Sequence, residues 1–212
     1  MAKHDARIGW ILAAGLLGAI LAAGFQGASD KIGTVDLNRL MTTSDLGKAS
    51  QARLTKMQAD RVGILTFMHD NRVLTADQAT QFRDLTLKDS LTTQESAELD
   101  RIKAEIVVDS KRDAELESKK SELTPEETAL LNNFAERSQT TAQLIKQWQD
   151  DFLKEMDDTA ASTRAQLLDK ARSSVQSVAK TQGFSVVFEA QVAPYSANDL
   201  TDSALQTMNA QK

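Results

Sequence analysis

The stretch from Thr124 to Val192 constrains the fold most strongly, because one very long helical pattern runs directly into a single β-strand pattern. Its start is strong: Thr124 is an N-cap, Pro125 takes the first helical position, and Glu127 completes a capping box. No further proline or glycine occurs before Gly183. At ~1.5 Å per residue, about 58 helical residues would span roughly 87 Å, far more than a compact domain needs. The sequence therefore predicts a very long helix that ends in a strand.

Apolar and small residues recur along this helix at alternating spacings of three and four, which is typical of a coiled-coil seam. The series is Leu131, Phe134, Ser138, Thr141, Ile145, Trp148 and Phe152. We expect its large members to pack the helix against a second one. These arm-packing residues are Phe134, Ile145, Trp148 and Phe152.

A strand pattern with a period of two follows Gly183, and a second short strand is predicted over residues 31–37. An isolated strand leaves its backbone groups unpaired, so we expect these two strands to pair. The residues between them read as helical and must therefore leave and return. The sequence predicts a mainly α fold in which a long α-helical hairpin, residues 46–182, is inserted between N- and C-terminal strands.

The capping-box motif that starts the long helix occurs twice earlier in the chain. Thr75 precedes Gln78, and Thr92 precedes Glu95, by the same three residues, and a leucine stands before each threonine. We interpret these two sites as helix starts that kink or break the outgoing limb of the hairpin. The hairpin turn itself is expected at 121–125, where the proline and the third capping box coincide.

Residues 25–45 and 183–212 are predicted to form a small β/α body. Two strands and a short helix over 199–209 cannot bury an adequate core alone, so oligomerisation is expected. Tyr195 is expected to bury its ring and to hydrogen-bond through its hydroxyl. The candidate oligomerisation residues are Ile32, Val35, Leu37, Phe184, Val186, Phe188, Val192 and Tyr195.

The N-terminus carries an export signal. Lys3 and Arg7 precede an apolar run over residues 8–25, which predicts a signal peptide over residues 1–24 with cleavage after Gly24. The run is also just long enough to span a bilayer, so an uncleaved anchor stays open. In both cases the remainder of the chain is exported.

Composition and motifs exclude several classes of function. The net charge of −5 argues against nucleic-acid binding, and the absence of cysteine excludes disulfides and thiolate chemistry. His69 lies beside Asp70, but the second histidine, His4, is in the predicted signal. No set of catalytic side chains assembles, so we expect a protein that is not an enzyme and that holds no cofactor or metal.

After the predicted signal the chain opens with Lys31-Ile32-Gly33-Thr34-Val35-Asp36. This stretch resembles the first strand of the Skp/OmpH family of periplasmic chaperones. The closing segment is the better match: residues 178–188, then Ala193-Pro194-Tyr195, then Asp199-Leu200-Thr201-Asp202. The resemblance covers the signal, residues 31–60 and residues 165–210.

This resemblance implies a jellyfish-like homotrimer whose helical arms surround a cavity. It also implies an ATP-independent periplasmic holdase that binds unfolded outer-membrane or envelope proteins. Phe67, Met68 and Phe82 lie off a clean seam and are our candidates for client contact, with packing against the other limb as the alternative. The arms differ from the basic arms typical of the family, because they carry slightly more acid than base. The alternative is a coiled-coil envelope spacer or adaptor, anchored in the membrane by residues 8–25.

Overall fold

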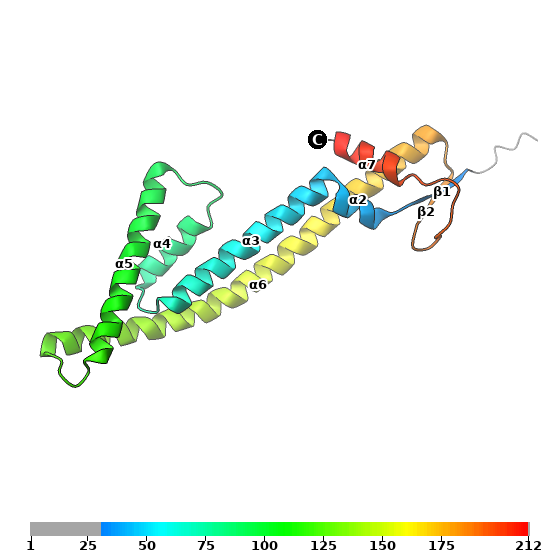
Figure 1. Cartoon of the computed structure of the whole chain (residues 1–212). Coiled ribbons are helices and arrows are strands. Elements are labelled where there is room, and N and C mark those ends of the chain that lie inside the picture. The colour runs from blue at the N-terminus through cyan, green and yellow to red at the C-terminus, as the bar shows by residue number, and fades with distance from the viewer. Residues whose placement is uncertain (1–30, 212) are drawn as a thin grey trace, which may run out of the picture. The chain divides into compact units, whose positions relative to one another are not determined.

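The computed structural model describes residues 31–211, which divide into two compact units (Figure 1). The described part of Met1–Gly47 together with Leu167–Lys212 forms one unit, here called the body, and Lys48–Gln166 forms the other, here called the arm. The body therefore includes the last part of the long helix, which the sequence pattern assigned to the hairpin. The predicted signal peptide or anchor lies outside the described residues.

The body is built on a parallel pair of strands. Strand β1 (Ile32–Val35) pairs with β2 (Val186–Glu189), with Ile32 opposite Val186 and Val35 opposite Glu189. The predicted pairing of the two strands is confirmed. Two short helices flank this pair, α2 (Leu37–Thr43) and α7 (Thr201–Ala210), and α7 is the short last helix expected from the sequence.

The second edge of β1 is occupied by the chain segment that leads into α7. The Thr34 amide donates to the Asn198 carbonyl at 2.9 Å, and the Leu200 amide donates to the Thr34 carbonyl at 2.8 Å. Thr34 thereby forms an isolated parallel bridge with Asp199. Strand β1 lies between two neighbours, whereas β2 has one strand neighbour within the described residues.

The core of the body lies between these elements and the end of α6 (Pro125–Gln182). Gly183, with φ of +72°, ends α6 in the left-handed region, where glycine is favoured. The Phe184 amide then donates to the Ala179 carbonyl at 2.9 Å, which satisfies a carbonyl of the last helical turn. The buried core residues are Val35, Leu40, Ala171, Val175, Val178, Leu200, Ala204 and Met208.

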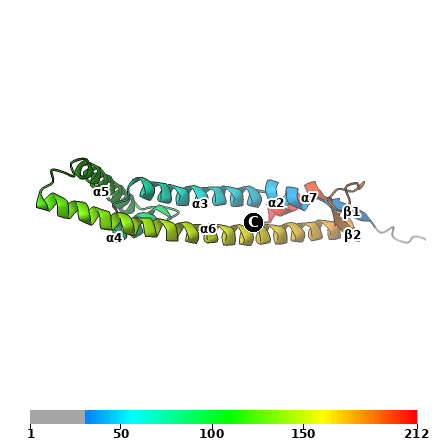
Figure 2. The ribbon, with the colours of Figure 1, turned by 90° about the horizontal axis from the view of Figure 1, so that it is seen from below.

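Four helical segments form the arm. They are α3 (Asp45–Asp70), α4 (Ala76–Thr86), α5 (Thr93–Ser118) and the first part of α6. The 58 residues of α6 form one uninterrupted helix from Pro125, as the sequence predicted, and α3 runs beside it in both views (Figures 1 and 2). The connection between α5 and α6 falls at the predicted hairpin turn.

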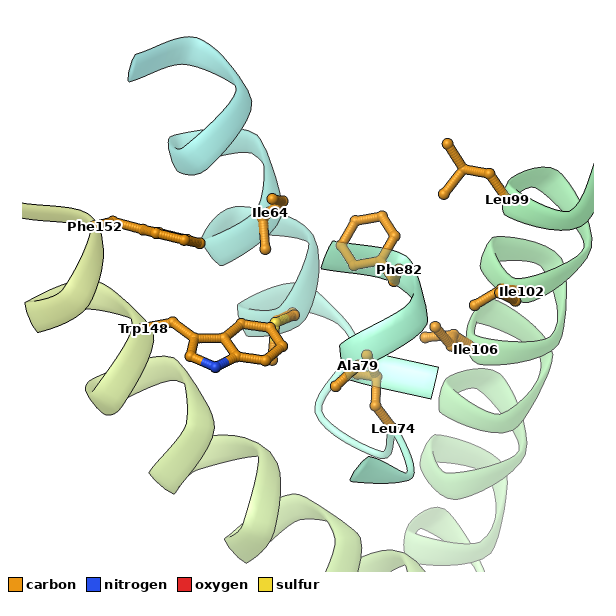
Figure 3. Close-up of a cluster of buried hydrophobic side chains, with 10 residues drawn as sticks. Ile64, Leu74, Ala79, Phe82, Leu99, Ile102, Ile106, Trp148 and Phe152 are labelled. Carbon is orange, nitrogen blue, oxygen red and sulfur yellow. The ribbon is translucent and has the colours of Figure 1, made fainter. Parts of the chain in front are cut away.

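The outgoing limb breaks into separate helices at both predicted sites, residues 71–75 and 87–92, so a break there is confirmed and a continuous limb that is only kinked is wrong. After α3 the chain turns at residues 71–75, and α4 and α5 then pack against each other as a second, shorter hairpin. The reason is an apolar cluster to which all four helical segments contribute (Figure 3). Its buried residues are Ile64, Met68, Leu74, Ala79, Phe82, Leu99, Ile102, Ile106, Trp148 and Phe152.

Each of the three repeated threonine motifs forms the capping box that the sequence predicts. Thr75, Thr92 and Thr124 each accept a hydrogen bond from the backbone amide three residues later, at 3.1 to 3.2 Å. The Gln78, Glu95 and Glu127 side chains accept from the threonine amides in return, at 2.9 to 3.1 Å. These contacts satisfy backbone donors that the first helical turn leaves free.

Gly33 in the body and Gly63 in the arm provide a matched test of packing. A Cβ at Gly33 would lie 2.3 Å from the Leu200 Cδ1 atom and 3.0 Å from the Phe184 ring, whereas a Cβ at Gly63 in α3 meets nothing within 4 Å. We expect Gly33→Ala to lower the free energy of unfolding by about 1–3 kcal/mol through overpacking. We expect Gly63→Ala to raise it by about 0.5–1 kcal/mol, because alanine favours the helix. Urea titrations measure both, and an unchanged midpoint for Gly33→Ala would refute the close packing.

Glu95, the side chain that completes the capping box of α5, has a lowered pKa that can be measured. A hydrogen bond from Lys88, reinforced by the Thr92 amide and hydroxyl, lowers the pKa of Glu95 from 4.5 to about 2. The folded state thus favours the carboxylate, so this stabilisation is present above pH 4.5 and is lost as the pH falls toward 2. We expect Lys88→Met to raise the Glu95 pKa part of the way back, since the Thr92 contacts remain. An NMR titration of the Glu95 side chain measures this, with Lys120→Met as the control that leaves it unchanged.

Candidate client-binding and assembly surfaces

The candidate oligomerisation residues divide into two groups. Val35, only 3% exposed, and the partly buried Leu37 and Phe184 pack in the core of the body. Phe184 precedes β2, and the Lys31 ammonium lies 4.2 Å from its ring centroid. These three side chains therefore stabilise the single chain.

The other five are exposed, and they come from both strands and the loop that follows β2. We call this group the strand-face residues: Ile32 (47% exposed), Val186 (43%), Phe188 (42%), Val192 (74%) and Tyr195 (89%). Within β2 exposure alternates, so Val187 contacts the core while Val186 and Phe188 lie on the exposed side. The expectation that the chain buries the Tyr195 ring is wrong for the single chain, since the loop over residues 190–197 carries it away from the core.

Three of the four arm-packing residues are buried, and they lie in two separate clusters. Trp148 and Phe152 belong to the cluster in Figure 3, and the partly buried Ile145 packs against it. Phe134 packs with Val73, Leu116 and Leu131 near the connection between α5 and α6.

The candidate client-contact residues also lie in the core of the arm. Met68 is 0% exposed and Phe82 is 2% exposed. The partly buried Phe67 ring lies 4.6 Å from the Phe82 ring, measured between centroids. These side chains occupy the interface of α3 with α4 and therefore present little surface to a client in this conformation.

Cations cover the ring faces of the arm's buried aromatic residues. The guanidinium of Arg83 lies 4.6 Å from the Trp148 ring centroid, and that of Arg61 lies 5.5 Å from the Phe152 centroid. Such contacts add a modest electrostatic attraction to apolar burial. They also place charged groups at the edge of the cluster, where the cluster meets solvent.

An open apolar groove lies between α3 and α6, on the arm. Its volume is about 370 Å³, and its lining residues are Gln58, Arg61, Val62, Leu65, Gln149, Phe152, Leu153 and Met156. Val62 is 54% exposed and Leu153 is 59% exposed. Sequence reasoning missed both, because Leu153 follows the seam residue Phe152 and Val62 stands between Arg61 and Gly63, so that each reads as an ordinary surface position. The groove could be found only by knowing that these two helices pair.

An ion pair fixes one side of this groove. The Arg61 guanidinium donates to both carboxylate oxygens of Glu155, at 2.7 and 3.1 Å, and to the Met57 carbonyl at 3.0 Å. The Arg61 side chain is 11% exposed, so this bidentate pair is shielded on the α3 side. It holds α3 and α6 together beside the exposed apolar side chains.

His69 has an ordinary structural environment. Its ring nitrogens lie 3.3 Å from the Arg72 guanidinium. Over residues 31–211, no group of three or more histidine, aspartate or glutamate side chains is arranged to hold a metal ion. Within that same range, no helix has the length and apolar character that a bilayer span requires.

Comparison with known proteins decides the family. A family model described as outer membrane protein (OmpH-like) matches residues 31–208, which is most of the chain. The chain belongs to the OmpH-like family. Searches of curated proteins and of solved structures gave no match. The OmpH-like match covers the body and the arm together, including the central helices whose sequence gave only weak resemblance.

Membership in the OmpH-like family indicates a general role as a chaperone of outer membrane proteins. The members are periplasmic, and they are chaperones and not enzymes. A mainly helical chain with a long α6 and a small two-stranded sheet agrees with the OmpH fold.

Proposed function

We propose that this protein is an ATP-independent periplasmic holdase that keeps unfolded outer-membrane or envelope proteins soluble. In this proposal three copies assemble through their bodies, and their helical arms enclose the client. The match of the OmpH-like family over residues 31–208 carries the proposal, because it spans both the assembly unit and the arm.

The strand-face residues support assembly. Large apolar side chains at five positions of the two strands and the following loop are exposed in the single chain, and clustered exposed apolar residues often mark an interaction site. Within the described residues, β2 also has no strand paired at its second edge. Contact with further copies would cover both the exposed apolar side chains and the unpaired edge of β2. Left exposed, such features promote non-specific association.

The arm supports reversible binding of clients. Its core holds the helices together, while the groove between α3 and α6 presents apolar side chains to solvent. Apolar contact is non-directional and therefore tolerates many client sequences. A few such contacts per arm, on several arms, give binding through multivalency without requiring any single tight site. A client held in this way is released when it folds, without an energy source.

The first test is suppression of aggregation. An unfolded outer-membrane β-barrel protein is diluted from urea with and without purified residues 25–212, and turbidity is followed without ATP. We expect suppression to saturate near one trimer per client. A lack of suppression with both acidic and basic clients would reject the holdase proposal and favour the envelope spacer or adaptor.

The second test concerns assembly. We expect Phe188→Asp to reduce the mass measured by light scattering to that of one chain, because assembly would bury an unpaired carboxylate. Circular dichroism should stay unchanged, since Phe188 is 42% exposed in the single chain. The matched control is Val108→Asp on α5, where the side chain is 64% exposed and lies outside the body. A Phe188→Asp protein that remains trimeric with unchanged melting would refute the role of this face.

A further inference from the structure

We propose that the hairpin of α4 and α5 is a lid on the arm, which opens away from α3 and α6 and uncovers the apolar face that binds clients. This inference rests on the proposed holdase function and names its client-binding surface. The structure then represents the closed state, in which α4 occupies that face.

Both connections between this hairpin and the rest of the arm pack in one small cluster. Val73, in the turn before α4, is buried in the cluster that holds Phe134 of α6, and Leu123, in the connection after α5, packs against it. Within the hairpin, α4 and α5 contact each other closely, and the Lys103 ammonium of α5 lies 5.8 Å from the Phe82 ring centroid of α4. The two helices can therefore turn as one piece about a single hinge.

The opposite end of the hairpin is less tightly packed. A cavity of about 250 Å³ lies beside the loop between α4 and α5, and Leu87 and Asp89 of that loop help to line it. The charged lining from α3 and α6 comprises Arg53, Lys56, Asp60, Arg61 and Glu155. Charged groups favour hydration over burial, so apolar packing is interrupted at this end of the hairpin.

Helices α3 and α6 also contact each other directly, without the hairpin. The Arg61 guanidinium of α3 donates to both carboxylate oxygens of Glu155 on α6, at 2.7 and 3.1 Å. The same guanidinium lies 5.5 Å from the Phe152 ring centroid. The pair of α3 and α6 can therefore stay together when the hairpin opens.

The hairpin covers the residues that the sequence singles out as client contacts. Across the interface of α3 with α4, the Phe67 and Phe82 ring centroids lie 4.6 Å apart, and Met68 is completely buried. On the α6 side, the Arg83 guanidinium of α4 lies 4.6 Å from the Trp148 ring centroid. Opening would separate these contacts, and an apolar client segment that replaced α4 would stabilise the open state.

The closed state also buries polar groups that opening would hydrate. Ile106 and Leu116 mark the buried face of α5, and Ser110 and Asp113 lie between them on that face by helical spacing. The Ser110 Oγ atom is buried, and no group within residues 31–211 forms a hydrogen bond with it. Burial, together with the nearby Glu117 carboxylate, raises the pKa of Asp113. Both groups therefore favour a state in which water reaches this face.

Thiol labelling of purified residues 25–212 measures opening, because the chain has no cysteine. Ala79→Cys places a thiol at a buried position of α4, and Thr80→Cys gives the rate for an exposed neighbour. We expect the Ala79→Cys thiol to react with an aromatic disulfide reagent at a rate that depends less steeply on urea than global unfolding does, because opening exposes less surface. Met68→Cys is a second buried probe if Ala79→Cys loses helix content. An equal urea dependence would overturn the lid.

A buried serine and an exposed serine of α5 provide a matched pair of variants. We expect Ser110→Ala to slow labelling of the Ala79→Cys thiol at least about fivefold, the effect of removing one unsatisfied hydroxyl from the closed state. Ser96→Ala, at an exposed position, gains the same helix propensity and should leave the rate unchanged. An unchanged rate in Ser110→Ala would show that α4 opens without α5, and this also overturns the lid.

A crosslink tests whether clients need the uncovered face. Asp109→Cys with Arg137→Cys replaces an ion pair of 3.0 Å between α5 and α6 by two thiols that a short bismaleimide can join. We expect the joined protein, with the mass of one chain on a denaturing gel, to lose suppression of aggregation. The same variant with each thiol capped separately should retain it.

The outcomes separate this inference from the proposed function. Full suppression by the joined protein would overturn the client role of the covered face and leave the holdase standing. A wild type without suppression would reject the holdase and that client role together, while the labelling rates would still decide whether the hairpin opens.

Discussion

The uninterrupted backbone of α6 is the constraint on which the other packing depends. Three separate hydrophobic clusters form in the described residues, and α6 contributes to each of them: Leu131 and Phe134 to one, Trp148 and Phe152 to another, Val175 and Val178 to the third. A helix of 58 residues satisfies its own backbone donors and acceptors along nearly its whole length, so its apolar side chains remain free to organise other elements. A proline near the middle of α6 would remove a backbone hydrogen bond and kink the helix, at a cost of about 3 kcal/mol or more.

The sequence could predict the elements that depend on local chemistry. Thr75, Thr92 and Thr124 start helices because a threonine and a carboxamide or carboxylate three residues later satisfy the same few backbone groups in almost any context. Gly183 ends α6 for an equally local reason. The pairing of β1 with β2 was also predictable, because two short strands far apart in a helical chain had no other partners.

The sequence could not predict what long-range packing decides. A capping box marks where a helix begins but not the direction it takes, so the reversal of α4 onto α5 was missed. In the structure Met68 and Phe82 are buried, where the sequence left both client contact and packing against the other limb open. A period of two shows which residues share a strand face, but it does not show which face meets the core. The groove on the arm needs two helices to be paired in register, because Val62 and Leu153 become neighbours only there.

The strand pairing has a consequence for folding. The body is closed by contacts between segments far apart in the chain, such as the hydrogen bond from the Asp36 amide to the Thr201 hydroxyl, 165 residues apart. Closing so long a loop in an unfolded chain costs conformational entropy, and pairing of α3 with α6 lowers that cost because it brings the two flanking segments of the chain closer. A chain that stops before Val186 lacks both β2 and α7, so it cannot complete the body.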